Sequence, residues 1–162
     1  MSAFGLTRQL DITRAEAQSY LDTYFERYTG VRDYMDNVRE EAKKDLYVET
    51  IMGRRLHVNE INAANGLRRQ AAERAAINAP LQGSAADIIK KAMLDVDTWI
   101  TNEAPDSTKM IMQVHDELIL EAKKADAEEV LNKVKEIMEA AVTLDIPLIV
   151  EASIGLNWNE AH

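Results

Sequence analysis

The stretch MIMQVHDELIL, Met110–Leu120, constrains the fold more than any other part of the chain. Apolar residues dominate it, yet His115, Asp116 and Glu117 stand consecutively at its centre. Two adjacent carboxylates are costly to bury unless something pairs with them. A tight turn at the centre, between two apolar strands, would lift these acids out of the core. The stretch therefore predicts a β-hairpin with an acidic tip, and the expected strands cover residues 109–114 and 117–122.

An acidic hairpin tip of this kind is suited to a divalent cation. Mg²⁺ prefers hard oxygen ligands and binds through one or two carboxylates together with substrate phosphates. Asp116 and Glu117 are therefore candidate metal-site residues, and His115 beside them can donate a hydrogen bond to a substrate. The alternative is a solvated turn, since turns favour aspartate. The apolar flanks on both sides favour the functional interpretation without deciding it.

Hydrophobic periodicity predicts helices in the first part of the chain. Thr13 and Glu16 have the spacing of a capping box, which marks a helix start. Apolar residues then recur at helical spacing on both sides of Gly30. These apolar residues are Ala17, Tyr20, Leu21, Tyr24, Phe25, Val31, Tyr34, Met35 and Val38.

Shorter elements complete the expected fold. Residues 47–51 and 55–58 flank a Met-Gly pair and predict a small β-hairpin. Beyond the acidic hairpin, residues 126–142 have helical periodicity, and residues 146–158 are typical of a last strand. The order of helices, hairpin, long helix, hairpin, helix and strand predicts an α+β fold with helices packed on a small antiparallel sheet.

The segment from Leu67 to about Ile100 is rich in alanine and strongly helix-forming. Pro80 lies inside it. Proline removes a backbone donor and clashes one turn back, so the helix is expected to kink or break near Ala79. Gly83, three residues later, has no side chain and permits a close approach of another group to the backbone.

The same segment carries a stripe of long polar side chains. Arg74, Asn78 and Gln82 are spaced by four and fall along one slowly drifting line on a helix. Donors of this kind suit phosphates and the minor-groove acceptors, which look similar in every base pair. Such contacts would test the shape of a duplex without reading its sequence. The competing interpretation is an ordinary polar helix face, which periodicity alone favours.

Charge and composition narrow the classes of protein. The net charge of −9 argues mildly against nucleic-acid binding, but residues 54–74 carry five basic and only two acidic residues. This basic segment, with Arg54, Arg55, Arg68 and Arg69, either follows a phosphate backbone or forms surface ion pairs. The lack of cysteine excludes disulfides and thiolate metal sites. No apolar run approaches the roughly 18 residues of a membrane span, and a cytoplasmic protein without a membrane partner is expected.

Together these segments resemble the bacterial DNA polymerase I family, the family A DNA polymerases. QVHDELILEA is similar to the family's C motif. The segments FGLTRQLDITRAEAQSYLDTYFERYTGV, GRRLHV, RRQAAERAAINAPLQGSAADIIKKAM and VEASIGLNW resemble further family segments in the same order. The resemblance covers essentially the whole chain, and its combination of motifs is more specific than the acidic tip alone.

The resemblance implies a role for each candidate residue. The metal-binding Asp of the C motif falls on Asp116, and Glu117 lies beside this catalytic Mg²⁺ site, which holds two metals in the full enzyme. The His that contacts the primer terminus falls on His115. The helix residues that contact template and primer fall on Arg74, Asn78 and Gln82. The implied reaction is template-dependent addition of deoxynucleotides to a primer 3′ end, used in DNA replication and repair.

The resemblance also implies a division of the chain. Residues 1–100 correspond to fingers-derived helices, the small hairpin and the long helix, and residues 101–162 correspond to a palm portion. In the family, a second metal-binding Asp and the nucleotide-binding helix precede this C-terminal segment. The isolated chain is therefore expected to be inactive, with nucleoside triphosphates bound only in the full enzyme. An unpaired sheet edge would favour self-association. The remaining alternatives are a non-catalytic duplex-binding fragment and an acidic helical interaction protein.

Overall fold

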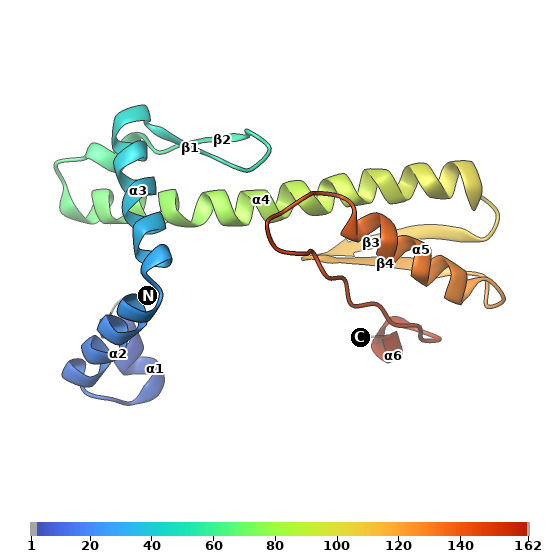
Figure 1. Cartoon of the computed structure of the whole chain (residues 1–162), viewed down its shortest axis with the longest axis horizontal. Coiled ribbons are helices and arrows are strands. Elements are labelled where there is room, and N and C mark those ends of the chain that lie inside the picture. The colour runs from blue at the N-terminus through green and yellow to red at the C-terminus, as the bar shows by residue number, and fades with distance from the viewer. Residues whose placement is uncertain (1–2, 162) are drawn as a thin grey trace. The chain divides into compact units, whose positions relative to one another are not determined.

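The computed structural model describes residues 3–161 of the chain (Figure 1). Its elements are listed here in chain order: α1 (Ala3–Leu10), α2 (Arg14–Arg27), α3 (Thr29–Asp45), β1 (Tyr47–Glu49), β2 (Arg55–His57), a 3₁₀ helix η1 (Asn59–Asn62), α4 (Gly66–Glu103), β3 (Thr108–Val114), β4 (Glu117–Ala122), α5 (Ala127–Glu139) and α6 (Trp158–Ala161). The chain divides into two compact units. Among the described residues, the first unit comprises 3–49 and 55–80, and the second comprises 50–54 and 81–161.

The first unit has a small apolar core between α3, the β1–β2 hairpin, η1 and the start of α4. Its buried members are Val38, Ala42, Val48, Val58, Ile61 and Ala76. The hydroxyl of Tyr34 donates to the carbonyl of Ile77 at 3.1 Å, which fastens α3 to α4 within this unit. Burial of this hydroxyl raises the pKa of Tyr34 above its ordinary value, because the charged form loses hydration.

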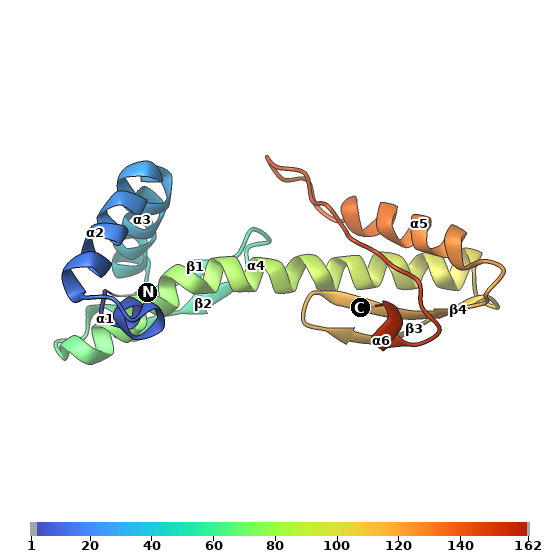
Figure 2. The same cartoon turned by 90° about the horizontal axis from the view of Figure 1, so that it is seen from below.

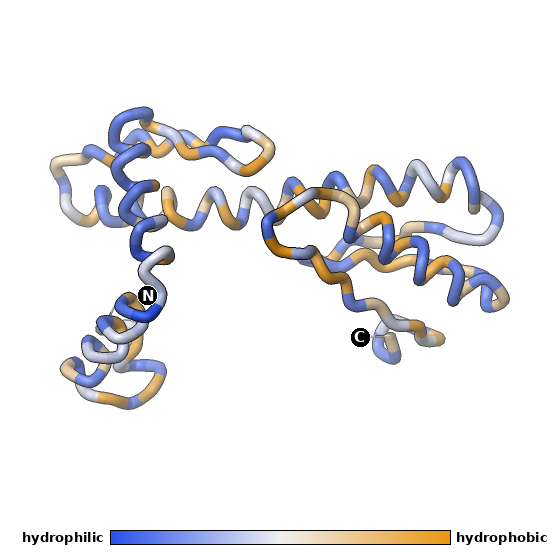
Figure 3. The backbone as a smooth tube through the Cα atoms, in the orientation of Figure 1, coloured by the Kyte–Doolittle hydropathy of each residue, from blue (hydrophilic) through white to orange (hydrophobic). Residues whose placement is uncertain are grey.

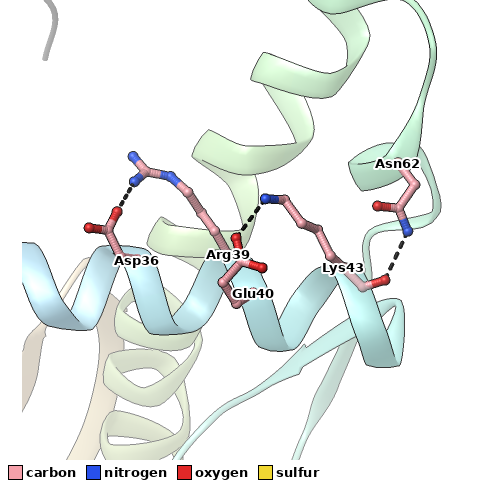
Figure 4. A network of polar contacts seen from close by, with 5 residues as sticks. All are labelled: Asp36, Arg39, Glu40, Lys43 and Asn62. Carbon is pink, nitrogen blue, oxygen red and sulfur yellow. Dashed lines mark hydrogen bonds and ion pairs between the residues drawn. The ribbon is translucent and has the colours of Figure 1, made fainter.

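Polar contacts lie along α3, and one of them connects α3 to η1, the 3₁₀ helix that follows the β1–β2 hairpin (Figure 4). The side-chain amide of Asn62 donates to the carbonyl of Lys43 at 2.8 Å, so the end of η1 is tied to the last turn of α3. Along α3, Arg39 pairs with Asp36 at 2.6 Å and Lys43 pairs with Glu40 at 2.7 Å. Exposed ion pairs one helical turn apart each contribute little to stability. The hydrogen bond of Asn62 is therefore the contact in this group that connects two elements.

The predicted capping box at the start of α2 is confirmed. The Thr13 hydroxyl accepts from the Glu16 backbone, and the Glu16 carboxylate accepts from the Thr13 backbone at 2.9 Å. The Thr13 hydroxyl also donates to the Glu16 carboxylate at 2.7 Å, and this bond, followed by the one from the Thr13 backbone N–H, holds the pKa of Glu16 below its ordinary value of 4.5. A carboxylate with a lowered pKa stabilises the folded state above its ordinary pKa and loses that contribution as the pH falls.

We therefore expect the capping box to contribute less to stability in acid. Thr13→Ala should lower the free energy of unfolding of the chain at neutral pH, and the difference from the wild type should shrink well below the ordinary carboxyl pKa. Urea unfolding of both proteins at the two pH values measures this. A difference that stays constant with pH would contradict the assigned role of Glu16.

The second unit packs α5 and the β3–β4 hairpin against the second half of α4 (Figures 1 and 2). Its buried core is formed by Val96, Ile100, Val130 and Val134. Half-buried side chains of the hairpin cover this core, namely Met110, Leu118, Leu120 and Ala122. The apolar stripe of α5 and the apolar face of the hairpin therefore share one core.

The predicted α+β class is confirmed, with the strands of the described residues in two separate sheets rather than one. Each sheet is an antiparallel hairpin, β1 with β2 and β3 with β4. The first hairpin is shorter than predicted, since β1 ends at Glu49 and β2 at His57. No helix within residues 3–161 combines the length and hydrophobicity that crossing a bilayer requires.

Of the predicted kink or break near Ala79, the break is wrong, because α4 runs unbroken for 38 residues with Pro80 inside it. Proline leaves one backbone carbonyl of the preceding turn without its helical partner. Packing offsets this loss. Ala72, Ala76 and Ala79 of α4 contact the core of the first unit, and residues after Pro80 are held by contacts of the second.

The predicted last strand over residues 146–158 is also wrong. This segment has no regular structure until the short helix α6. Figure 3 shows hydrophobic positions recurring along it, and Ile149 and Leu156 are 73% and 86% exposed. A strand needs a partner for its backbone N–H and C=O groups, and this segment pairs with no strand within the described residues.

Candidate nucleic-acid and metal site

The acidic hairpin has the geometry that the sequence predicts. Val114 of β3 pairs with Glu117 of β4, which leaves His115 and Asp116 as a two-residue turn. His115 has a φ of 51°, in the left-handed region that two-residue hairpin turns require at their first position. Asp116 is exposed and Glu117 is half-buried. The two acids therefore lie at the rim of the core and not inside it. The chain thus avoids the free-energy cost of burying two adjacent carboxylates.

Packing and one hydrogen bond hold the tip of this hairpin. Leu118 and Leu120 of β4 contact the apolar core of the second unit. Near the turn, the side-chain amide of Gln113 donates to the carbonyl of His115. Farther down β3, the register shifts between Met110 and Met112, so one extra residue forms a β-bulge there. The tip is thus fixed by the strands behind it while its polar groups face outward.

The donor chemistry at the tip fits part of a Mg²⁺ site. The exposed Asp116 on the turn offers a hard oxygen ligand of the kind that Mg²⁺ binds together with phosphate oxygens and water. Within residues 3–161, however, no three His, Asp or Glu side chains gather closely enough to hold a metal ion. Asp116 could therefore supply one ligand, and the described residues do not complete the set.

The three stripe residues all lie on α4 and are all exposed. Arg74 and Asn78 belong to the first unit, and Gln82 belongs to the second, two residues after Pro80. Ala76, between Arg74 and Asn78 in the sequence, is buried in the core of the first unit, so packing points these two side chains away from that core. The assignment of the three stripe residues as nucleic-acid contacts stays a prediction, as does that of His115.

Four of the five arginines between residues 54 and 74 make polar contacts inside the chain. Arg54 pairs with Asp87 at 2.5 Å, Arg55 with Glu49 at 2.6 Å, and Arg68 with Glu60 at 3.3 Å. Arg69 donates to the carbonyl of Ala63 at 3.1 Å. The Arg55–Glu49 hydrogen bond raises the pKa of the Arg55 guanidinium. The basic segment was expected either to follow a phosphate backbone or to form surface ion pairs. The contacts of Arg54, Arg55 and Arg68 support surface ion pairing.

Sequence reasoning missed what occupies the space beside Gly83. A Cβ built at this position would lie 2.6 Å from Cγ2 of Thr50, which belongs to the tip of the β1–β2 hairpin. The Thr50 hydroxyl accepts from the backbone of Arg54 at 3.1 Å, which holds its side chain in place. A glycine inside an alanine-rich helix was the available signal, since such a glycine often marks close packing.

We expect Gly83→Ala to destabilise the second unit although alanine is the better helix former. The helix gains about 1 kcal/mol, but overpacking against Thr50 costs about 1–3 kcal/mol. Thr50→Ser removes Cγ2 and keeps the hydroxyl, so Gly83→Ala should become stabilising in that background. Urea unfolding of the four proteins in this cycle tests it. Equal effects in both backgrounds would mean that Thr50 does not fill this space.

Comparisons with known proteins agree with this architecture. Residues 1–160 match the family described as DNA polymerase family A, and the chain belongs to that family. It is 52% identical over its whole length to DNA polymerase I of Pseudomonas aeruginosa, and 47% identical over 99% of its length to DNA polymerase I of Streptococcus pneumoniae. The chain spans 18% of the length of each of these relatives.

A solved structure shows the same fold. The chain superposes with a TM-score of 0.93 and 45% identity on the structure titled POL domain of Pol1 from M. smegmatis complex with DNA primer-template and dNTP. The match covers 99% of this chain and 28% of that one. The fold described above is therefore that of a segment of a POL domain.

Proposed function

We propose that the chain is part of a DNA-directed DNA polymerase, which adds deoxynucleotides to a primer 3′ end as its template directs. The observation that carries this proposal is the exposed Asp116 on a two-residue hairpin turn, in a chain of the family A polymerases. Primer-template DNA and deoxynucleoside triphosphates are the proposed partners, because the similar POL domain is described with both. We place its action at the bacterial nucleoid, in replication and repair.

In this proposal Asp116 is a metal ligand and Glu117 adjoins the same site. Mg²⁺, when bound, would neutralise the charge that develops on phosphate oxygens during phosphoryl transfer. The reaction is attack of the primer 3′-hydroxyl on the α-phosphate of a deoxynucleoside triphosphate, with pyrophosphate leaving. Asp116 supplies one hard oxygen from outside the apolar core, and His115, next to it on the turn, contacts the primer terminus.

The stripe on α4 would align the duplex. Arg74, Asn78 and Gln82 are exposed donors on α4, so each can reach nucleic acid without unfolding the unit to which it belongs. Contacts to phosphates and to the common minor-groove acceptors position a duplex without specifying its sequence. We further propose that residues 1–100 derive from the fingers and residues 101–162 from the palm.

Primer extension in the presence of Mg²⁺ tests the proposed function. We expect a complete family A polymerase that contains these 162 residues to extend a primer, and the 162-residue chain alone not to extend it. If the chain alone extends a primer and Asp116→Asn abolishes that extension, the expectation that the metal needs ligands from outside this chain would be contradicted. A polymerase containing this chain that neither extends nor binds primer-template DNA would contradict the proposal itself.

Gln82→Ala is expected to weaken use of the primer terminus. Loss of one hydrogen bond to the duplex, about 0.5–1.5 kcal/mol, should lower kcat/KM for primer-template by about 3- to 10-fold. Because the acceptors involved are common to all base pairs, the loss should be the same for every terminal pair. Steady-state extension on templates that differ in the terminal pair measures it. A new sequence bias would contradict the shape-testing role.

A further inference from the structure

The tip of the β1–β2 hairpin, residues 50–54, contacts α4 immediately after Gln82. Arg54 Nη2 lies 2.5 Å from Oδ1 of Asp87 and donates to the carbonyl of Gly83 at 3.1 Å. The backbone N–H of Ile51 donates to the hydroxyl of Ser84 at 3.0 Å. Thr50 fills the space that Gly83 leaves open. We call the contacts of residues 50–54 with Gly83, Ser84 and Asp87 the hairpin clamp.

Burial makes the ion pair of the clamp more than a surface contact. The Asp87 side chain is 12% exposed, whereas that of Arg54 is 58% exposed. The second carboxylate oxygen of Asp87, Oδ2, is buried and has no hydrogen-bond partner among residues 3–161. A buried carboxylate needs a compensating charge. Arg54 supplies it from the hairpin, so the hairpin tip and this turn of α4 are held to each other.

The clamp lies where the helix most needs an external support. Pro80 has no N–H to donate to the carbonyl one turn earlier, so the helix is weakened around it. Gln82 follows two residues later, and the next residue, Gly83, is the one whose carbonyl Arg54 binds. A residue that fixes Gly83 and Asp87 also fixes the backbone from which the Gln82 side chain projects.

We propose that Arg54 is a positioning residue that acts through Gln82: the hairpin clamp fixes the turn of α4 after Pro80 and so aims Gln82 at the duplex. This inference rests on the proposed function, in which Gln82 contacts the primer-template. Arg54 itself does not touch nucleic acid in this account, because its guanidinium is engaged by Asp87 and by the Gly83 carbonyl.

A double-mutant cycle in a complete polymerase containing this chain tests the inference. Gln82→Ala and Arg54→Ala should each lower kcat/KM for primer-template by about 3- to 10-fold, and the double variant should lose no more than the worse single one. Arg54→Lys, which keeps a donor and a charge for Asp87, should recover part of the loss. Multiplied losses in the double variant would overturn the inference while leaving the role of Gln82 intact.

Asp87→Asn separates positioning from direct phosphate contact. It leaves the Arg54 charge in place but removes the charge of its ion-pair partner, so positioning predicts a loss in the same direction as that of Arg54→Ala. Direct contact of Arg54 with DNA predicts no loss, which would overturn the inference. Arg55→Ala is the matched control, because it removes the neighbouring arginine charge, whose partner Glu49 lies in β1 and not in α4. Any effect that Arg55→Ala shares with Arg54→Ala is an effect of charge alone.

A second double variant and a hydrogen-exchange measurement separate a loss of positioning from a loss of folding. Arg54→Ala combined with Asp87→Asn leaves no unpaired buried charge, so a loss that persists in this folded variant reflects positioning and not unfolding. In the 162-residue chain, hydrogen exchange of the Ile51 amide should be slow in the wild type and faster in Arg54→Ala. Fast exchange in the wild type would overturn the clamp. No effect of Gln82→Ala would remove both the proposed contact and the inference that depends on it.

Discussion

Asp116→Asn is expected to lower the turnover of a complete polymerase containing this chain by about 10³-fold, while its affinity for primer-template DNA stays nearly unchanged. Charge stabilisation by a metal at a reacting phosphate contributes several kcal/mol, and an asparagine oxygen carries no net charge to hold that metal. Asp116 is exposed on a turn whose packing comes from the strands behind it, so the substitution should leave the fold intact. Single-turnover primer extension and equilibrium binding measure the two quantities.

Asp106→Asn is the matched control for this prediction. Asp106 is also exposed and precedes β3, so it stands at the other end of the same hairpin. Its substitution removes the same charge without touching the turn, and turnover should stay near that of the wild type. Near-normal turnover in Asp116→Asn would contradict the metal assignment, and a large loss in both variants would point to the net charge of the hairpin.

The parts of the fold that the sequence predicts are those set by local patterns. The capping box at Thr13 and the two-residue turn at His115 each involve residues at most a few positions apart. At the turn, apolar strands on both sides left only one way to keep Asp116 out of the core. These elements were predictable because the competing conformations would bury charge or leave helix donors unsatisfied.

The parts that were not predictable depend on partners distant in the chain. Pro80 argued locally for a break, yet α4 continues because residues on both sides of it are packed within their own units. Residues 146–158 have the composition of a strand but pair with no strand in the part of the chain that the structure describes. The contact of Thr50 with Gly83 joins residues 33 positions apart, and no periodicity in either segment indicates it.

The candidate site also has a part that local sequence patterns predict and a part that depends on residues distant in the chain. The placement of Asp116 and Glu117 at a hairpin tip followed from local patterning and is confirmed by the structure. The pairing of Arg54 with Asp87 did not follow from it, because charge counting treats all arginines of the basic segment alike. Only burial distinguishes Asp87, which is why the proposed positioning role of Arg54 rests on the structure and not on the sequence.

Ile61→Ala is expected to destabilise the first unit by about 2–5 kcal/mol, the usual cost of truncating a fully buried isoleucine. The Ile61 side chain is 0% exposed and lies in the 3₁₀ helix η1, at the centre of a core whose other buried members are valines and alanines. Small neighbours with restricted side chains cannot easily fill the space left behind, so the cost should lie toward the upper part of this range.

The distribution of aromatic residues lets this prediction be read unit by unit. All five tyrosines lie within residues 20–47, in the first unit, and both tryptophans, Trp99 and Trp158, lie in the second. In urea unfolding, Ile61→Ala should shift the transition followed by tyrosine absorbance more than the transition followed by tryptophan fluorescence. Val96→Ala, which truncates a fully buried side chain of the second unit, should do the reverse.

Two controls decide what the Ile61→Ala result means. Ile61→Val should cost only about 0.5–1.5 kcal/mol, because it removes a single methyl group from the same site. Ile146→Ala truncates an isoleucine that is 72% exposed, so its effect should stay within about 0.5 kcal/mol. Equal shifts of both transitions in Ile61→Ala would mean that the two units unfold as one cooperative body. The parts of α4 before and after Pro80 would then unfold together.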